Sequence, residues 1–352
     1  MTPFGRWRTT RLGALPLAAA VGLLLLSVLT GSSWLPLLAG ASLGLSGAAF
    51  VLRPNVAGIT CTVTGPARTA VGEAVTHLVH VHNTGGRTTS RAQVTLTLAG
   101  FADAVLTVDA LLPGGAASVA VTRPAASRGI ARHAMAEAVS STPFGLLQAR
   151  TVSLVPHPVL VHPQPVRPRR VPVGGAIGAA DANAVVTRAG PDLHGIREWR
   201  TGDSRRDVHW RSSARRGRLV VVEREEPQQR ALTMLIAGTP AADDWERLLA
   251  VAAATAAAVA RSGRDVELLA THDGVARLTT GRPVDVLDWF AGLGVVEVPR
   301  ADEVQRAFDA AGRGGDVVVA VSEALPADWW AWLQSGAAAQ RVAVHRLTAA
   351  SA

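Results

Sequence analysis

Residues 231–271 of this 352-residue chain read ALTMLIAGTPAADDWERLLAVAAATAAAVARSGRDVELLAT. The apolar run over 231–237 predicts a buried strand, and the Ala-rich stretch ending at Arg261 predicts a helix. Residues 266–271 repeat the apolar run and predict a second strand. This strand–helix–strand order is typical of an α/β domain with parallel strands.

The same alternation continues to the end of the chain. Strands are predicted over 275–279, 316–322 and 341–347, and helices over 284–293, over 302–311 and after Pro326. Short connections between alternating strands and helices predict a doubly wound, mostly parallel sheet over residues 231–352.

The N-terminal residues 1–53 predict a transmembrane helical hairpin. Leu12–Thr30 and Leu35–Leu52 are uncharged apolar runs joined by only four residues. At about 1.5 Å per residue each run spans roughly 27–29 Å, close to the hydrocarbon thickness of a bilayer. A cleaved signal peptide is the alternative for the first run, but it does not explain the second.

Charges around the hairpin predict its topology. Arg residues precede the first run and Arg53 follows the second, so the positive-inside rule predicts a two-pass cell-membrane protein with both termini in the cytoplasm. Trp34 in the connector suits a membrane interface. Gly40 and Gly44 form a small-residue face that is expected to let the two helices approach closely.

Between residues 54 and 160 the hydrophobic period changes to two, which predicts a small antiparallel β-sandwich. His80 and His82 share one predicted strand face and His77 lies on the other. A solvated face is preferred there over a metal site, because no third ligand is evident. Residues 157–172 are rich in Pro and Arg and residues 173–183 in Gly and Ala, which predicts a linker or surface strap, bounded at residues 161–194. His157 and His162 fall in the Pro-rich stretch and are given no role.

Composition limits the classes of partner. All 35 basic residues are Arg, which together with 27 acidic residues gives a net charge of +8. Arg in place of Lys is typical of GC-rich coding sequence, so nucleic acid is not expected as a partner. The 48% hydrophobic content excludes wholesale disorder. The single Cys61 excludes a disulfide scaffold and a Cys-rich zinc module.

Residues 195–230 carry the sequence pattern that says most about function and are called the signature segment. Residues 195–226 of it read GIREWRTGDSRRDVHWRSSARRGRLVVVEREE. Thr201-Gly202-Asp203 predicts a turn, with Asp203 or Ser204 as the cap of a helix over 205–216 that ends at Gly217. A strand is predicted over 219–222. Seven Arg against two Asp between residues 200 and 218 make the segment locally basic.

This segment resembles the domain of unknown function 58 family. The family's motif falls on Arg197, Gly202, Asp203, Arg206, Trp210, Ser213, Ala214 and Arg215. Trp199 stands where the family has Tyr, and Val208 where it has Ile. Residues 141–146, Ser-Thr-Pro-Phe-Gly-Leu, resemble a second element of that family. The resemblance implies a membrane-anchored protein with a von Willebrand factor A-like domain. It also implies a MoxR-type AAA ATPase as partner, and transglutaminase-like membrane proteins as neighbours.

The metal site of von Willebrand factor A domains is degenerate here. Intact members carry Asp-x-Ser-x-Ser after the first strand, and this chain has Ala237, Thr239 and Ala241 at those positions. Asp243 and Asp244, further on, are better explained as helix caps. We therefore expect neither a metal nor another cofactor.

Three hypotheses for function remain. The preferred one is a non-catalytic, cytoplasm-facing interaction or scaffold protein that docks a partner through the signature residues, His209 and Trp199 included. The second is an enzyme on cell-envelope substrates that uses Asp203 and His209, with Ser212 or Ser213 as nucleophile, although no Gly-x-Ser-x-Gly elbow surrounds either Ser. The third is binding of anionic lipid or nucleic acid by the Arg cluster.

Overall fold

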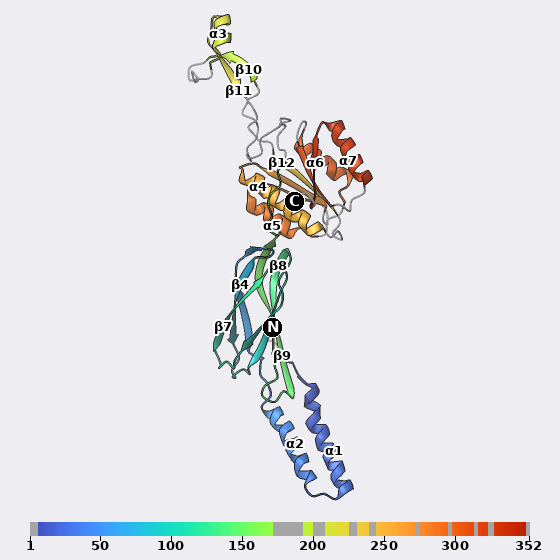
Figure 1. The fold of residues 1–352 in the computed structure, drawn as a ribbon. Helices are drawn as coiled ribbons and strands as arrows, with labels where there is room; N and C mark the ends of the chain where they lie inside the picture. The colour runs from blue at the N-terminus through green and yellow to red at the C-terminus, as the bar shows by residue number, and fades with distance from the viewer. Residues whose placement is uncertain are drawn as a thin grey trace. The chain divides into compact units, whose positions relative to one another are not determined.

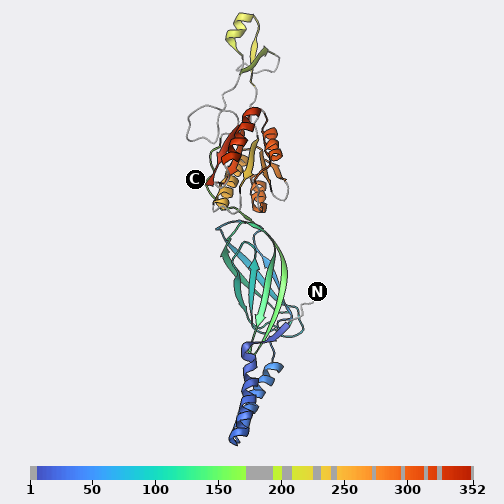
Figure 2. The ribbon, with the colours of Figure 1, turned by 90° about the vertical axis from the view of Figure 1, so that its right-hand side faces the viewer.

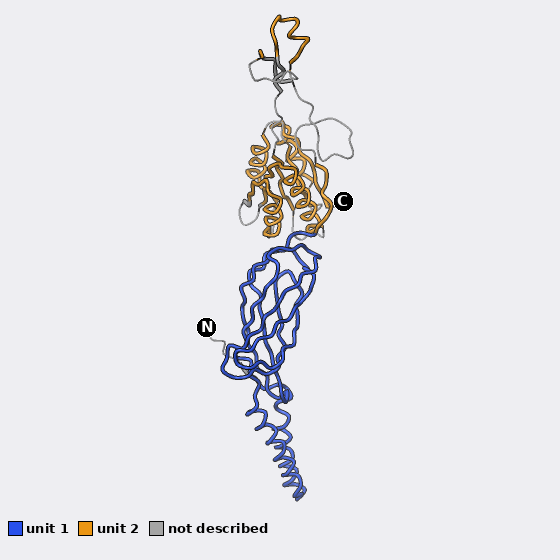
Figure 3. The backbone as a smooth tube through the Cα atoms, turned by 90° about the vertical axis from the view of Figure 1, so that its left-hand side faces the viewer, with its two compact units in different colours: residues 1–164 blue, residues 165–352 orange. Residues whose placement is uncertain are grey.

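A computed structural model of the chain describes residues 6–171, 193–199, 208–224, 231–238, 244–271, 275–294, 298–312, 316–322 and 327–349. These residues form a mixed α/β structure with an apolar helix pair at the N-terminus and several sheets (Figure 1). The backbone divides into two compact units, residues 1–164 and residues 165–352 (Figure 3).

The N-terminal pair consists of α1 (Leu15–Thr30) and α2 (Leu35–Val51). With the 3-10 turn η1 (Arg11–Ala14) before it, α1 forms a 20-residue segment long and apolar enough to cross a membrane, whereas α2 is a shorter apolar helix. The predicted contact through Gly40 and Gly44 is wrong, because a Cβ added at either glycine meets nothing within 4 Å. The residues that the pair buries are instead Ala20, Ala39 and Ala49.

A short strand that the sequence did not indicate ties α1 to the sandwich. It is β1 (Arg6–Thr9), which pairs antiparallel with β9 (Leu147–His162). The Thr10 amide then donates to the Leu146 carbonyl at 3.0 Å, and its Oγ1 donates to the Gly145 carbonyl at 2.6 Å. Gly13 is needed for this close approach, because a Cβ there would lie 2.2 Å from the Leu146 oxygen.

The remaining strands of unit 1 are β2 (Ile59–Thr64), β3 (Arg68–Ala70), β4 (Ala74–Asn83), β5 (Ala92–Leu98), β6 (Ala104–Val108), β7 (Ala116–Pro124) and β8 (Gly129–Ser140). One sheet has the order β2-β4-β7 and the other β1-β9-β8-β5-β6, with β3 added in parallel to β9. All other pairs are antiparallel, as predicted.

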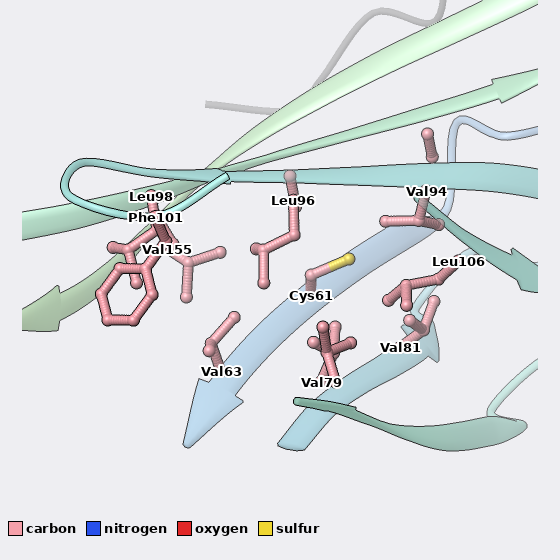
Figure 4. Close-up of a cluster of buried hydrophobic side chains, with 14 of the residues drawn as sticks. Cys61, Val63, Val79, Val81, Val94, Leu96, Leu98, Phe101, Leu106 and Val155 are labelled. Atoms are coloured by element: carbon pink, nitrogen blue, oxygen red, sulfur yellow. The ribbon is translucent and has the colours of Figure 1, made fainter. Parts of the chain in front are cut away.

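Alternating residues from both sheets of unit 1 share one core. Figure 4 shows Val79 and Val81 of β4 facing Val94 and Leu96 of β5, with Cys61 of β2 among them. All five side chains are less than one-tenth exposed. Burial raises the pKa of the Cys61 thiol to about 11, so the thiol behaves as a small apolar group at neutral pH.

The predicted linker begins later than the Pro pattern indicated. His157 and His162 are residues of β9 and not of a linker, because Pro156 and Pro158 are accommodated within a long strand that has a register shift near them. Within unit 2, the Arg169 amide donates to Thr255 Oγ1 at 3.0 Å, and Val171 packs against the core of the α/β domain. These contacts attach residues 169–171 to the α/β domain, and residues 172–192 lie outside the described part.

The strands of the α/β domain are β12 (Leu232–Ala237), β13 (Val266–Thr271), β14 (Val275–Thr280), β15 (Asp316–Val321) and β16 (Ala343–Leu347). Its helices are α4 (Trp245–Arg261), α5 (Pro283–Gly292), α6 (Ala301–Ala311) and α7 (Ala327–Gln340). The sheet order is β14-β13-β12-β15-β16, parallel except for the edge strand β14. The alternating pattern predicted from the sequence is confirmed.

Helices cover both faces of this sheet (Figure 2). Met234 and Ile236 of β12 pack with residues of α4 and α5, whereas Leu235 and Ala237 pack with residues of α6 and α7. Every residue of β12 is therefore buried, which explains why its sequence is a continuous apolar run.

Candidate functional site

The signature segment folds around a two-stranded antiparallel sheet of β10 (Leu193–Glu198) and β11 (Val220–Arg224). Helix α3 (Trp210–Arg216) precedes β11. Two backbone hydrogen bonds extend the pairing beyond the strands: the Trp199 amide donates to the Leu219 carbonyl at 3.0 Å, and the His209 amide donates to the Val220 carbonyl at 2.9 Å. Both donors precede α3 and both acceptors follow it, so these bonds fix the chain before the helix to the chain after it.

Helix α3 starts later than predicted. Val208 is buried in an isolated β-bridge and His209 is non-helical, so the predicted helix over 205–216 is wrong at its start. The cap is His209, whose Nδ1 accepts a hydrogen bond from the Ser212 amide at 3.2 Å. The predicted caps Asp203 and Ser204 lie outside the described residues. The end of the helix at Gly217, in the left-handed conformation, is confirmed.

Ser213 locks α3 onto β11. Its side chain is buried; Oγ donates to the His209 carbonyl at 3.1 Å and accepts from the Val220 amide at 2.9 Å. A hydroxyl held by two backbone groups is not placed as a nucleophile beside a base, because its proton and a lone pair are already used. Among the described side chains of this segment there is no Ser–His hydrogen bond, because the Ser213 hydroxyl and the His209 ring both bond to backbone groups.

The other side of α3 is open. Trp210 is 65% exposed, and Arg211, Ala214 and Arg215 are exposed beside it. Arg218, after the helix, forms an ion pair with Glu198 of β10. The helix therefore presents its Trp and its three Arg to solvent.

The remaining signature residues are only partly described. Trp199 is half-buried, and its Nε1 is buried without a hydrogen-bond partner among the described groups. Arg197 lies in β10, although its side chain is not described. Gly202, Asp203 and Arg206 lie outside the described residues.

The carboxyl edge of the α/β sheet was the second candidate site. Ala237 ends β12 fully buried, and Thr239 and Ala241 are not described. Asp244 stands at the start of α4 but makes no side-chain capping bond; its Oδ1 accepts from the buried Ser322 Oγ at 3.2 Å. Among the residues that the structure describes, no group of three or more His, Cys, Asp or Glu is placed to hold a metal.

Sequence reasoning missed a buried polar cluster in the sandwich. His77 of β4 and Arg123 of β7 lie within the core, and His157 of β9 lies against them. The His77 ring contacts the rings of Phe101 and His157 at centroid distances of 5.0 and 5.4 Å. The Arg123 guanidinium lies 5.2 Å from the Phe101 centroid and donates to the carbonyls of Leu96 and Ala102.

Burial governs the electrostatics of this cluster. Burial, followed by repulsion from Arg123 and from His157, lowers the pKa of His77 to about 4. Burial also lowers the pKa of His157, opposed by a hydrogen bond to the Val63 backbone. Alternation along β4 was the available signal, since His77 shares its face with Val75, Val79 and Val81. By contrast His80 and His82 lie on the outer face, as predicted.

No known family profile matches this chain, and no curated protein matches it either. Among solved structures, a CARDB domain from Pyrococcus furiosus is 16% identical and covers 30% of this chain and 94% of its own, with a TM-score of 0.21. Red sea bream transglutaminase is 18% identical and covers 29% of this chain and 14% of its own, with a TM-score of 0.21. A β-glucosidase from Listeria innocua is 16% identical over 30% of this chain and 16% of its own, with a TM-score of 0.19. Similarity at this level carries no argument about function.

Proposed function

We propose that this chain is a membrane-anchored, cytoplasm-facing interaction protein without catalytic activity, and a member of the domain of unknown function 58 family. The α/β domain is then a von Willebrand factor A-like domain whose metal site has been lost, and the partner is a MoxR-type AAA ATPase. The motif residues Trp210, Ser213, Ala214 and Arg215 support the family assignment. The sheet order and the helices on both its faces support the domain assignment.

The single observation that carries the proposal is that the Ser213 hydroxyl hydrogen-bonds to two backbone groups. This hydroxyl fixes α3 to β11, and the same attachment leaves Trp210 and Arg215 exposed. A catalytic segment would be expected to direct a nucleophile toward a base, whereas this one uses its serine to hold an aromatic and cationic surface in place. Partner docking fits that arrangement better than chemistry does.

Co-purification with a MoxR-type AAA ATPase tests this function. The full chain, solubilised in detergent, is expected to retain the ATPase in at least one nucleotide state. Ser213→Ala releases α3 and is expected to weaken retention. Ser212→Ala is the matched control, because the structure shows only the backbone of Ser212 making hydrogen bonds. Lack of retention in every nucleotide state would overturn the proposed partner.

The topology is proposed on the apolar helix pair and its flanking charges. Segment 11–30 is long enough to span a bilayer, and Arg53 follows α2. We expect protease added to intact cells to leave residues 54–352 uncut, and protease added to inverted membrane vesicles to degrade them. Cleavage in intact cells would place the soluble units outside the cytoplasm.

A further inference from the structure

We propose that the outward face of α3, formed by Trp210, Arg211, Ala214 and Arg215, binds a carboxylate-rich segment of a protein partner. This inference rests on the proposed interaction function and adds the chemistry of the partner. The four side chains are all exposed. We call these four side chains the α3 face.

Helical spacing places these residues together. Trp210 and Ala214 are four residues apart, as are Arg211 and Arg215, so two rows lie side by side on the helix surface. Ser213 marks the opposite direction, because it is buried against β11. The α3 face is therefore a continuous patch with an indole, a small side chain and two guanidinium groups.

The patch is held rigidly. The His209 cap fixes the first turn, the Ser213 hydroxyl fixes the middle, and Gly217 ends the helix before β11 begins. Because the helix cannot rotate without breaking these bonds, little ordering of the helix is needed when a partner binds. Rigid aromatic and Arg side chains are the types that dominate binding energy at protein interfaces.

The charges identify the partner. Arg218 is paired with Glu198, but among the described residues Arg211 and Arg215 form no ion pair. A guanidinium group matches a carboxylate with two parallel hydrogen bonds, and two of them one helical turn apart can engage two carboxylates of one segment. Ala214 leaves room for that segment to lie beside the Trp210 ring.

Anionic lipid and nucleic acid fit the α3 face less well. Insertion into a lipid interface draws on several large apolar side chains, and α3 has only Trp210. Single-stranded nucleic acid needs several aromatic side chains along a basic groove, on which successive bases stack. The composition of the α3 face instead resembles the centre of a protein interface, with Trp and Arg around a small residue.

A fluorescein-labelled octaglutamate peptide is the probe, added to the full chain in phosphatidylcholine nanodiscs at about 0.15 M salt, where loose attraction between exposed charges is screened. We expect binding, with octaglutamine showing none. Trp210→Ala and Arg211→Gln are each expected to weaken binding about tenfold, a loss typical of an interface anchor or a charge-assisted hydrogen bond. Arg215→Lys, which keeps the charge but loses the planar fork, is expected to weaken binding about threefold.

Arg216→Gln is the matched control, because it removes one exposed Arg from the other side of α3. An equal loss in Arg216→Gln would show that net charge alone attracts the peptide and would overturn the proposal. Tighter binding to phosphatidylserine vesicles or to a single-stranded oligonucleotide, with the same dependence on Trp210, would overturn it in favour of those ligands. If octaglutamate fails to bind while Ser213→Ala still weakens ATPase retention, the partner chemistry is wrong and the interaction function stands.

Discussion

The sandwich and the α/β domain bury ionisable groups in different ways. In the α/β domain the buried carboxylates have partners: Glu267 pairs with Arg277 at 2.5 Å, and Glu303 accepts from the Arg300 amide at 2.9 Å. In the sandwich, His77 has neither ring nitrogen bonded within the described part, and Arg123 and His157 also keep unbonded nitrogens. The α/β domain thus places a guanidinium group or a backbone amide beside these two buried carboxylates, whereas the sandwich carries a desolvation cost that depends on the protonation of its histidines.

The largest expected effect is on the apolar core of the α/β domain. Phe290 of α5 is fully buried between α4 and the sheet, so Phe290→Ala leaves a cavity. We expect it to lower the free energy of unfolding of this domain by about 3–5 kcal/mol. Hydrogen exchange of β12 and β15 peptides in urea reports the loss. Unchanged exchange in the sandwich strands β4 and β8 would show that the two cores are separate, and a matching loss there would contradict this.

A fall in pH is expected to lower the stability of the sandwich selectively. His77 has a pKa of about 4 in the folded sandwich against about 6.5 in an unfolded chain, so the unfolded state takes up the proton first as the pH falls. The sandwich should keep its stability above pH 6.5 and lose up to about 3 kcal/mol between pH 6.5 and 4. The charged groups that affect His77 are Arg123 and His157, and Asp103 acts on Arg123.

Urea unfolding of the sandwich between pH 4 and pH 8 measures this dependence. His77→Leu, which keeps an apolar side chain in the core, is expected to flatten the profile. His80→Leu is the control, because His80 lies on the outer face of the same strand. A profile that stays steep in His77→Leu would assign the acid sensitivity to His157 or to other groups.

The smallest expected effect concerns the strap on the α/β domain. Thr255 Oγ1 accepts from the Arg169 amide at 3.0 Å and donates to the Val251 carbonyl at 2.7 Å. Thr255→Val keeps the shape and removes both bonds, and is expected to cost about 1–3 kcal/mol because each hydrogen bond contributes about 0.5–1.5 kcal/mol. Faster exchange of the Arg169 amide, with β12 unchanged, would locate the loss in the strap. A uniform loss over the domain would mean that the strap is part of its core.

Periodicity predicted the strands and helices well, because burial imposes it directly. Continuous apolar runs such as β12 occur where both faces of a sheet are covered, and the alternation in β4 occurs where only one is. Pairing over long distances leaves no such pattern. The strand β1 has a partner more than 130 residues away, and the Pro residues in β9 resembled a linker although the strand accommodates them with a register shift.

The candidate site was predictable in its residues but not in its geometry. The motif identified Ser213 and Trp210, yet their opposite burial follows from hydrogen bonds to β11, which no local spacing specifies. Residue preference assigned the cap to Asp203 or Ser204, whereas the chain is still in a β-bridge at Val208 and the helix begins only at Trp210, with His209 as its cap. Tertiary pairing overrode a local preference here.

The attachment at Thr10 has a mechanical consequence. The strand β1 is paired to β9, and only Thr10 separates it from η1, which leads directly into α1. The sandwich and the segment that is long enough to cross a membrane are therefore joined without a flexible linker. The Leu146 carbonyl lies so close to Gly13 that the start of the helix has little freedom to swivel. We therefore expect a change in the tilt of α1 to move β9 with it.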